Sequence, residues 1–399
     1  MPWEETTMLD SRCKFVAAYL DHELPMAALC RSFGISRTTG YHLVHRYFQE
    51  GPEGLGSQSR APRHHPQAVA EEIEEDLVAC RAQHATWGPR KLRAALVRRE
   101  PERPWPAPST IGELLHRRGL TVPRRRPRGT APAPTGLTDP NGPNEVWAAD
   151  FKGHFALEAG PRCHPLTISD GASRMLLRCQ ALPREGGEVV KPVFAAAFAE
   201  YGLPRILRTD NGAPFASTGP TGLTRLSAWW IKLGLTPERI APGHPEQNGR
   251  HERMHRTLKK ETTQPPQRNL RAQQRAFDRF RQEYNYERPH EALGQKVPAE
   301  LYSRSPREYP VRLPEVAYPA DLVVRRVRNK GHIRWHGQLL FVSEALCGEP
   351  VGLEPQDERY WALYYNHLPL LILDDYTGAW LPALAAAQRL RALREPSEP

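Results

Sequence analysis

The stretch that decides the fold is Ala241–Lys260, APGHPEQNGRHERMHRTLKK. Two prolines and two glycines predict a loop in its first half, and the breaker-free remainder predicts a helix. On that helix one carboxylate, Glu252, stands among seven basic side chains. An ordinary ion pair with Arg256 would explain it. So would a divalent metal held beside a phosphodiester, because metal and phosphate need opposite charges side by side.

Composition narrows the class of partner. The 399 residues are enough for two to four domains, and the formal net charge is +10. A basic surplus of this size indicates nucleic acid or an anionic membrane. No run approaches the roughly 18 apolar residues of a spanning helix, and the acidic N-terminus lacks the form of a signal peptide. We therefore predict a cytoplasmic protein that binds nucleic acid and no membrane.

Cysteine spacing argues against two further kinds of site. The six cysteines include no CxxC pair, so neither a disulfide framework nor a structural zinc site is expected.

The first 50 residues predict a helix-turn-helix DNA-binding domain. A short helix over 25–33 is followed by a turn at Gly34 and by Ser36, which is a good N-cap for a second helix. In such a unit the first residues of the second helix reach base edges in the major groove. These expected readers are Arg37, Thr38, Thr39, Tyr41 and His42. A helical hairpin used for packing or dimerisation remains the alternative.

Two linkers separate the next parts of the chain. Residues 51–66 are rich in glycine, proline and serine, and residues 67–120 predict a second helical DNA-binding unit. Residues 121–143 form a basic, proline-rich linker in which Arg124, Arg125 and Arg126 suit non-specific phosphate contacts through counterion release.

The segment from 144 to 305 predicts an α/β domain with carboxylates on its strands. Strands are expected over 145–152, 165–170, 175–180 and 205–212, with a helix over 189–201. Asp150 and Asp210 both fall on strands. Folded together with Glu252, they would form an acidic pocket for metal ions.

Four segments of this domain carry a family resemblance: Trp147–Asp150, Thr209–Gly212, Pro242–Leu258 and Tyr284–Leu293. Together they resemble the integrase catalytic core of bacterial insertion-sequence transposases, and they are similar to the IS481-like group. The resemblance covers residues 140–305. It implies an RNase H-like fold and an Asp-Asp-Glu triad that holds two Mg²⁺ ions, with Mn²⁺ as the alternative metal. Asp150 and Asp210 carry over onto the first two positions.

The third carboxylate needs a choice between two residues. The retroviral spacing of 35 residues after the second aspartate selects Glu246, whereas the motif selects Glu252, which follows Gly249 by three residues. We expect Glu252, because a helix holds a metal ligand more rigidly than a loop of prolines and glycines.

The resemblance implies a transposase that binds the ends of a mobile DNA element, cuts them by metal-assisted phosphodiester hydrolysis and joins the 3′-hydroxyl ends to target DNA. Its partner would be double-stranded DNA, bound by a dimer or higher homo-oligomer at the bacterial nucleoid. His255, Arg256 and Lys259 would hold DNA near the scissile bond. Asn285 and Arg288 would either touch DNA or pack and cap. An RNase H-like nuclease without joining and a non-catalytic DNA-binding regulator remain alternatives.

Short alternating strands over 320–375 predict a small SH3-like β-barrel with a basic edge, and residues 381–399 form a tail. The fold class expected is therefore multidomain α+β: helix-turn-helix units, an RNase H-like α/β catalytic core and a C-terminal barrel.

Overall fold

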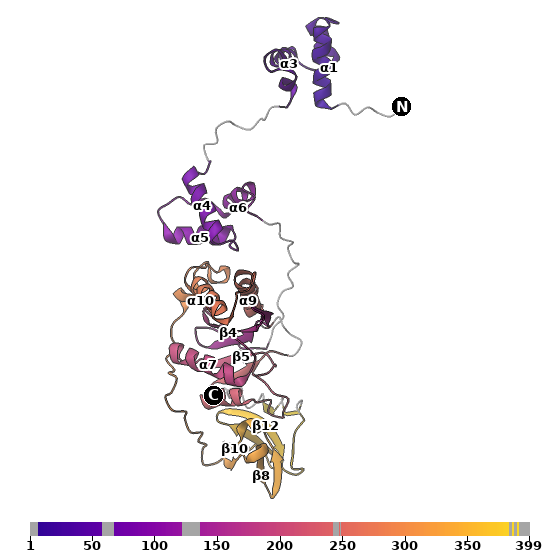
Figure 1. Ribbon diagram of the computed structural model, residues 1–399. Helices are drawn as coiled ribbons and strands as arrows, with labels where there is room; N and C mark the ends of the chain where they lie inside the picture. Colours follow the sequence, from indigo (N-terminus) through magenta and orange to yellow (C-terminus); the bar gives the residue numbers. More distant parts are fainter. Residues whose placement is uncertain are drawn as a thin grey trace. The chain divides into compact units, whose positions relative to one another are not determined.

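The computed structural model describes residues 7–57, 68–121, 136–241, 247, 249–382, 385–386 and 389–390. The chain divides into two compact units, Met1–Val69 and Ala70–Pro399. Figure 1 shows the elements of both units along the chain. No helix in the described part of the chain is long and apolar enough to cross a membrane.

The first unit is a three-helix domain. It consists of α1 (Met8–Leu20), α2 (Met26–Ser32) and α3 (Arg37–Glu50), followed by the short 3-10 helix η1 (Gly51–Leu55). Ser36 caps α3 as the sequence predicts, because its hydroxyl accepts the amide of Thr39 at 3.1 Å. Gly34 makes the turn between α2 and α3 with φ of 65°, a backbone conformation that favours glycine.

The second unit begins with three more helices. They are α4 (Glu71–Gln83), α5 (Pro89–Arg99) and α6 (Pro108–Arg117), and each of the last two begins with a proline, whose fixed φ suits the first position of a helix. Leu77, Leu92 and Ile111, one from each helix, are completely buried.

A mixed sheet forms the centre of the second unit. Its strands are β1 (Val146–Phe151), β2 (Phe155–Ala156), β3 (Arg162–Asp170), β4 (Leu176–Leu182), β5 (Ile206–Thr209) and β6 (Thr236–Arg239). β3 lies between β1 and β4 and is antiparallel to both, while β5 is parallel to β1 and β6 is parallel to β5. This arrangement agrees with the expected RNase H-like core.

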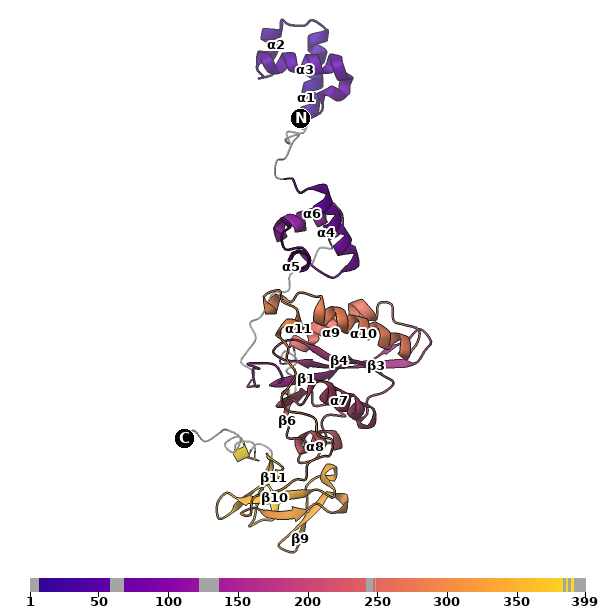
Figure 2. The same cartoon turned by 90° about the vertical axis from the view of Figure 1, so that its left-hand side faces the viewer.

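Helices cover both faces of this sheet (Figure 2). On one face, α7 (Gly187–Tyr201) and α8 (Arg225–Lys232) pack against strand residues that include Trp147 and Ile168. Trp229 and Trp230 belong to this core, so they pack the helix onto the sheet. On the other face lie α9 (Gly249–Thr262) and α10 (Leu270–Tyr286). The short helices η3 (Glu291–Leu293) and α11 (Pro298–Leu301) follow α10.

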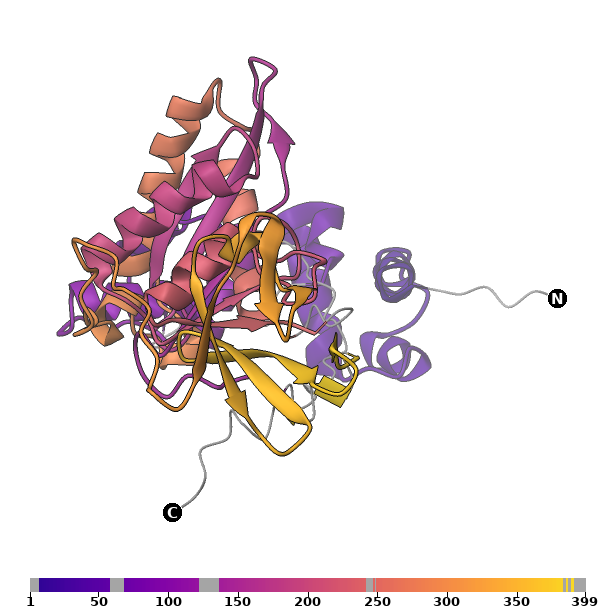
Figure 3. The same ribbon diagram turned by 90° about the horizontal axis from the view of Figure 1, so that it is seen from below.

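The C-terminal strands form a sheet of their own, drawn in orange and yellow in Figure 3. They are β7 (Val323–Arg326), β8 (His332–Trp335), β9 (Gln338–Phe341), β10 (Pro350–Pro355), β11 (Tyr360–Tyr365), β12 (Leu368–Asp374) and β13 (Ala379–Trp380). Among the described residues the five-stranded order β13-β12-β11-β10-β7 is open, so a closed SH3-like barrel is not confirmed. The β8–β9 hairpin pairs only with itself in this part of the chain, and it contributes to the shared apolar core through Ile333 and Leu340.

Candidate active site

Asp150 lies on β1, whereas Asp210 directly follows the neighbouring parallel strand β5 and so lies one residue beyond the strand on which the sequence predicts it. β1 and β5 pair with Ala148 opposite Arg208, and extending this register by two residues brings Asp150 level with Asp210. Trp147 and Ala149 face the core formed with α7 and α8. Because side chains alternate along a strand, Asp150 points to the opposite face, on which α9 packs.

Glu252 lies in the first turn of α9 and is exposed. Burial, together with the negative charges of Asp210 and, more weakly, Glu252, raises the pKa of Asp150 to about 7. The charges of the three carboxylates therefore interact, but in the described part of the chain neither Asp210 nor Glu252 belongs to a group of potential metal-ligand atoms within 4.8 Å of one another. Burial also raises the pKa of Asp210, although the backbone amide of Gly212 donates to its carboxylate at 3.2 Å.

Two histidines lie beneath Asp150. His251 and His255 are 2% and 4% exposed, and the Nε2 atoms of both rings lie within hydrogen-bond distance of the Thr167 hydroxyl, at 2.6 and 2.7 Å. His255 Nδ1 lies 3.8 Å from an oxygen of Asp150. Asp150, His251 and His255 each offer a potential metal-ligand atom, and these atoms all lie within 4.8 Å of one another.

The burial of these histidines corrects one prediction. Desolvation lowers the pKa of His251 to about 4 and that of His255 to about 2, so both rings are neutral near pH 7. The His255 ring is buried against Thr167 of the sheet, so the expected DNA contact from its side chain is wrong. The sequence does contain a signal for this, since positions 251, 255 and 258 share one helical face and Leu258 is buried.

The other expected DNA contacts fall into three groups. Arg256 and Lys259 are exposed on α9, and Arg37, Thr38, Thr39, Tyr41 and His42 are exposed on α3. The hydroxyl of Thr39 is engaged with Ser36 at 2.8 Å, so it belongs to the helix cap. Arg124, Arg125, Arg126 and Glu246 lie outside the described residues.

Asn285 and Arg288 follow the packing alternative. The Asn285 side chain accepts a hydrogen bond from the amide of Leu176 at 2.8 Å and donates one to the Leu176 carbonyl at 2.9 Å. It thus satisfies the backbone at the start of β4 as a neighbouring strand would. Arg288 is 5% exposed and donates to Glu261 at 2.9 Å. Both side chains hold elements together.

Asp170, at the end of β3, has a structural role. It is 1% exposed and accepts hydrogen bonds from the amide and hydroxyl of Ser173 and from the amide of Asn144, at 2.6 to 2.7 Å. These bonds fix the turn between β3 and β4.

Models of known families match most of this chain. Two integrase core domain models match residues 140–245 and 233–298. A helix-turn-helix domain matches residues 12–63, and a homeodomain-like domain matches residues 39–115.

Similar proteins come from bacterial insertion elements. The chain is 32% identical over 196 residues to the insertion element IS407 uncharacterized 31.7 kDa protein of Burkholderia multivorans, covering 49% of this chain and 68% of that protein. It is 29% identical over 241 residues to the insertion element IS476 uncharacterized 39.2 kDa protein of Xanthomonas euvesicatoria, covering 59% and 66%.

Among solved structures, the HTLV-2 integrase catalytic core domain in complex with magnesium is similar with 16% identity and a TM-score of 0.31, over 40% of this chain and 96% of that one. The family models and the bacterial relatives agree with the order of domains along the sequence. The chain belongs to the insertion-element transposases that carry an integrase core domain behind N-terminal helix-turn-helix domains.

Proposed function

We propose that this transposase binds the ends of its mobile element, cuts them by phosphodiester hydrolysis and joins the 3′-hydroxyl ends to target DNA, with Asp150, Asp210 and Glu252 as the catalytic carboxylates. The observation that carries the proposal is that the β1–β5 register places Asp150 level with Asp210, while the charge of Glu252 on α9 also acts on Asp150.

The residues present fit a divalent metal centre. Carboxylate oxygens are hard ligands that suit Mg²⁺, and Mn²⁺ fits the same set. Asp150 is held beside two other acidic groups, and a cation would relieve that repulsion. Two Mg²⁺ ions bound by Asp150, Asp210 and Glu252 would activate the attacking hydroxyl or water and stabilise the departing oxygen.

Thr167, His251 and His255 act as positioning residues in this proposal. The Thr167 hydroxyl has one proton and lies within hydrogen-bond distance of the Asp150 carbonyl, at 3.1 Å, and of both imidazole Nε2 atoms. At least one ring must therefore donate its Nε2 proton to Thr167. Asp150 and Thr167 are opposite each other in the β1–β3 pair, so this network ties α9 to the strand that carries Asp150.

The DNA contacts follow the charge and exposure of the helices. The exposed start of α3 would read the element ends, while Arg256 and Lys259 would hold DNA beside Glu252. Joining two ends to one target requires at least a dimer on double-stranded DNA. The bacterial cytoplasm, at the nucleoid, is the expected location.

Strand transfer of labelled element-end DNA by matched variants tests the proposal. Asp150→Asn, Asp210→Asn and Glu252→Gln each remove a ligand charge with little change of volume, so all three should lose cutting and joining while binding ends as the wild type does. Glu246→Gln is the control that retains activity. If Glu246→Gln alone is inactive, the third ligand is assigned wrongly. Cutting without joining by the wild-type protein would favour the nuclease alternative.

A further inference from the structure

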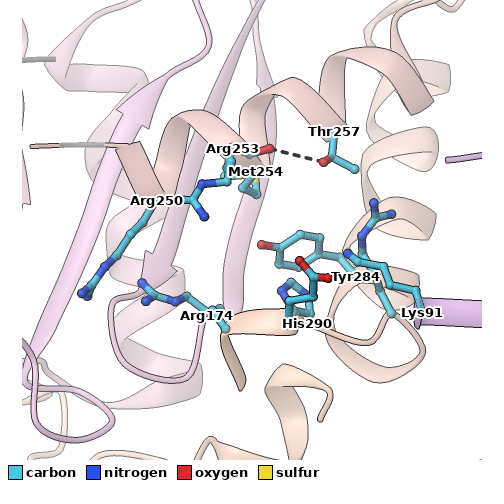
Figure 4. A pocket seen from close by; sticks show the side chains of 11 residues that line it. Lys91, Arg174, Arg250, Arg253, Met254, Thr257, Tyr284 and His290 are labelled. Carbon is cyan, nitrogen blue, oxygen red and sulfur yellow. Dashed lines mark hydrogen bonds between the residues drawn. The ribbon is translucent and has the colours of Figure 1, made fainter. Parts of the chain in front are cut away.

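A cavity of about 310 Å³ lies beside α9 (Figure 4). Its wall combines the start of α5, the turn between β3 and β4, α9 and the segment that follows α10. We call it the basic pocket and define it by its cationic side chains: Lys91, Arg174, Arg250, Arg253 and Arg288.

Only some of these charges are compensated. Arg288 pairs with Glu261 at 2.9 Å, and Arg250 pairs with Asp139 at 2.9 Å. In the described part of the chain, the Lys91 amine and the Arg253 guanidinium make no hydrogen bond or ion pair. The acidic side chain described in this wall, Glu291, lies 3.3 Å from the exposed Arg90.

The pocket holds its cations at an electrostatic cost. Burial and the neighbouring charge of Arg288 lower the pKa of Lys91 to about 8, against the smaller opposing effects of Glu291 and Glu261. Burial, together with the charge of Arg250, lowers the pKa of Arg174 to about 10. Opposite charge placed among these groups would reverse both shifts. The pocket is therefore arranged for an anion.

The wall is also preorganised. Arg174 has φ of 66°, a conformation that costs free energy, and it is held in the turn that Asp170 fixes through Ser173. The Nε2 atom of His290 is buried without a hydrogen-bond partner in the described structure. The His290 ring packs edge-on against Tyr284, with centroids 4.7 Å apart. A bound group that can form hydrogen bonds would give this buried nitrogen a partner.

We propose that the basic pocket binds a phosphate group of the DNA on which the transposase acts. This inference rests on the proposed function for the identity of the ligand. Phosphate suits the pocket because arginine can donate paired hydrogen bonds to its oxygens and lysine places a compact positive charge beside them.

A wider groove shares part of its wall with this pocket. The groove has a volume of about 760 Å³ and shares Lys91, Arg253 and Arg288 with the basic pocket. Arg256 and Lys260 also line it, and Arg256 lies one helical turn beyond Glu252. A DNA strand in this groove would meet cations along its backbone between Glu252 and the basic pocket.

The phosphate has two possible sources on DNA. A terminal 5′-phosphate carries close to two negative charges near pH 7, whereas an internal phosphodiester carries one. Both present the same oxygen chemistry, so the experiment must separate them.

The first test measures the thermal stability of the full chain with and without inorganic phosphate, at constant ionic strength. Phosphate at ten times its Kd should raise the wild-type Tm by about 2 °C. Lys91→Met and Arg253→Met should lose most of this rise. Arg279→Met, which removes one charge from the exposed face of α10, should keep it. An equal rise in all four proteins would overturn the proposal.

Lys91→Met separates a binding role from a structural one. Because the Lys91 amine is desolvated without a partner, its removal should leave the Tm without phosphate unchanged or higher. A lower Tm in Lys91→Met that also appears in Arg253→Met would assign both residues to folding and would overturn the proposal.

The second test uses element-end duplexes that carry a 5′-phosphate or a 5′-hydroxyl. If the pocket takes the terminal group, Lys91→Met should weaken binding of only the phosphorylated duplex, by roughly tenfold. If the pocket binds an internal phosphate, binding of both duplexes should weaken equally. The slope of the logarithm of the binding constant against the logarithm of salt concentration should then decrease in magnitude by about one. Unchanged binding of both would contradict the proposal.

Both tests are repeated in Asp150→Asn, which separates this inference from the proposed function. A phosphate response that persists in this variant stands whether or not the carboxylates catalyse joining. A response that disappears with Asp150→Asn would place phosphate at the catalytic carboxylates and would overturn the assignment to the basic pocket.

Discussion

Binding of Mg²⁺ should release a fractional number of protons that the state of Asp150 determines. With a pKa of about 7, Asp150 is about half protonated at pH 7 in the metal-free protein. A metal ligand must be ionised, so binding should displace about 0.9 proton at pH 6, about 0.5 at pH 7 and about 0.1 at pH 8. The apparent affinity for Mg²⁺ should therefore be roughly tenfold weaker at pH 6 than at pH 8.

The sign of the accompanying change in stability follows from the same shift. Between about pH 4 and pH 7 the folded chain binds a proton at Asp150 that the unfolded chain does not. The metal-free protein should consequently lose stability as pH rises through this window, and Mg²⁺ should oppose the loss. Asp150→Asn should remove this contribution, because amide nitrogen and oxygen do not titrate there.

Isothermal titration calorimetry in two buffers of different ionisation enthalpy measures the released protons. Asp321→Asn is the matched control, since Asp321 is exposed on the C-terminal part of the chain. Asp210→Asn should lower the pKa of Asp150 and so reduce the release at pH 7, along with the affinity. A release near zero at pH 6, or one that Asp321→Asn changes as much as Asp210→Asn, would refute the reasoning.

Two further predictions concern other parts of the molecule. Asn285→Ala should reduce the free energy of unfolding by about 2–4 kcal/mol, because it leaves the buried amide and carbonyl of Leu176 without partners. Tyr286→Ala, at the exposed next position, should reduce it far less. Urea unfolding measures both changes, and equal losses would contradict the role of Asn285. Arg37→Ala should weaken binding to element ends roughly tenfold and binding to random DNA much less. The control is Lys14→Ala, which changes an exposed residue of α1. In a gel-shift titration, an equal loss of affinity for both DNAs would show that Arg37 contacts only phosphate.

The sequence predicts features that depend on local chemistry. The cap at Ser36, the helix starts at Pro89 and Pro108, and the helical position of Glu252 each follow from a few neighbouring residues. The open C-terminal sheet does not follow in this way. Alternating residues predict strands, but the pairing of the last strand with the first depends on contacts between distant segments.

The sequence alone also does not predict every role that a buried polar residue plays. The role of Asn285 becomes clear only from the fold, which places the start of β4 beside the end of α10. Its partner Leu176 is 109 residues away along the chain. His255 differs from Asn285, because its helical spacing to Leu258 indicates the buried face of α9 even though its neighbours in the sequence are basic. Local pattern therefore identifies the proposed metal-binding carboxylates more readily than the residues that support them.

The helix α9 explains why so basic a segment carries a single acidic residue in its first turn. Its buried face holds neutral histidines against the strand of Asp150, which avoids placing fixed cations where metal ions would bind. Its basic side chains instead point to solvent or into the basic pocket and the wider groove. Glu252 then lies at the boundary between an anionic site and a cationic surface. A phosphodiester placed at that boundary could contact metal ions and arginine at once, which neither a uniformly acidic nor a uniformly basic helix would allow.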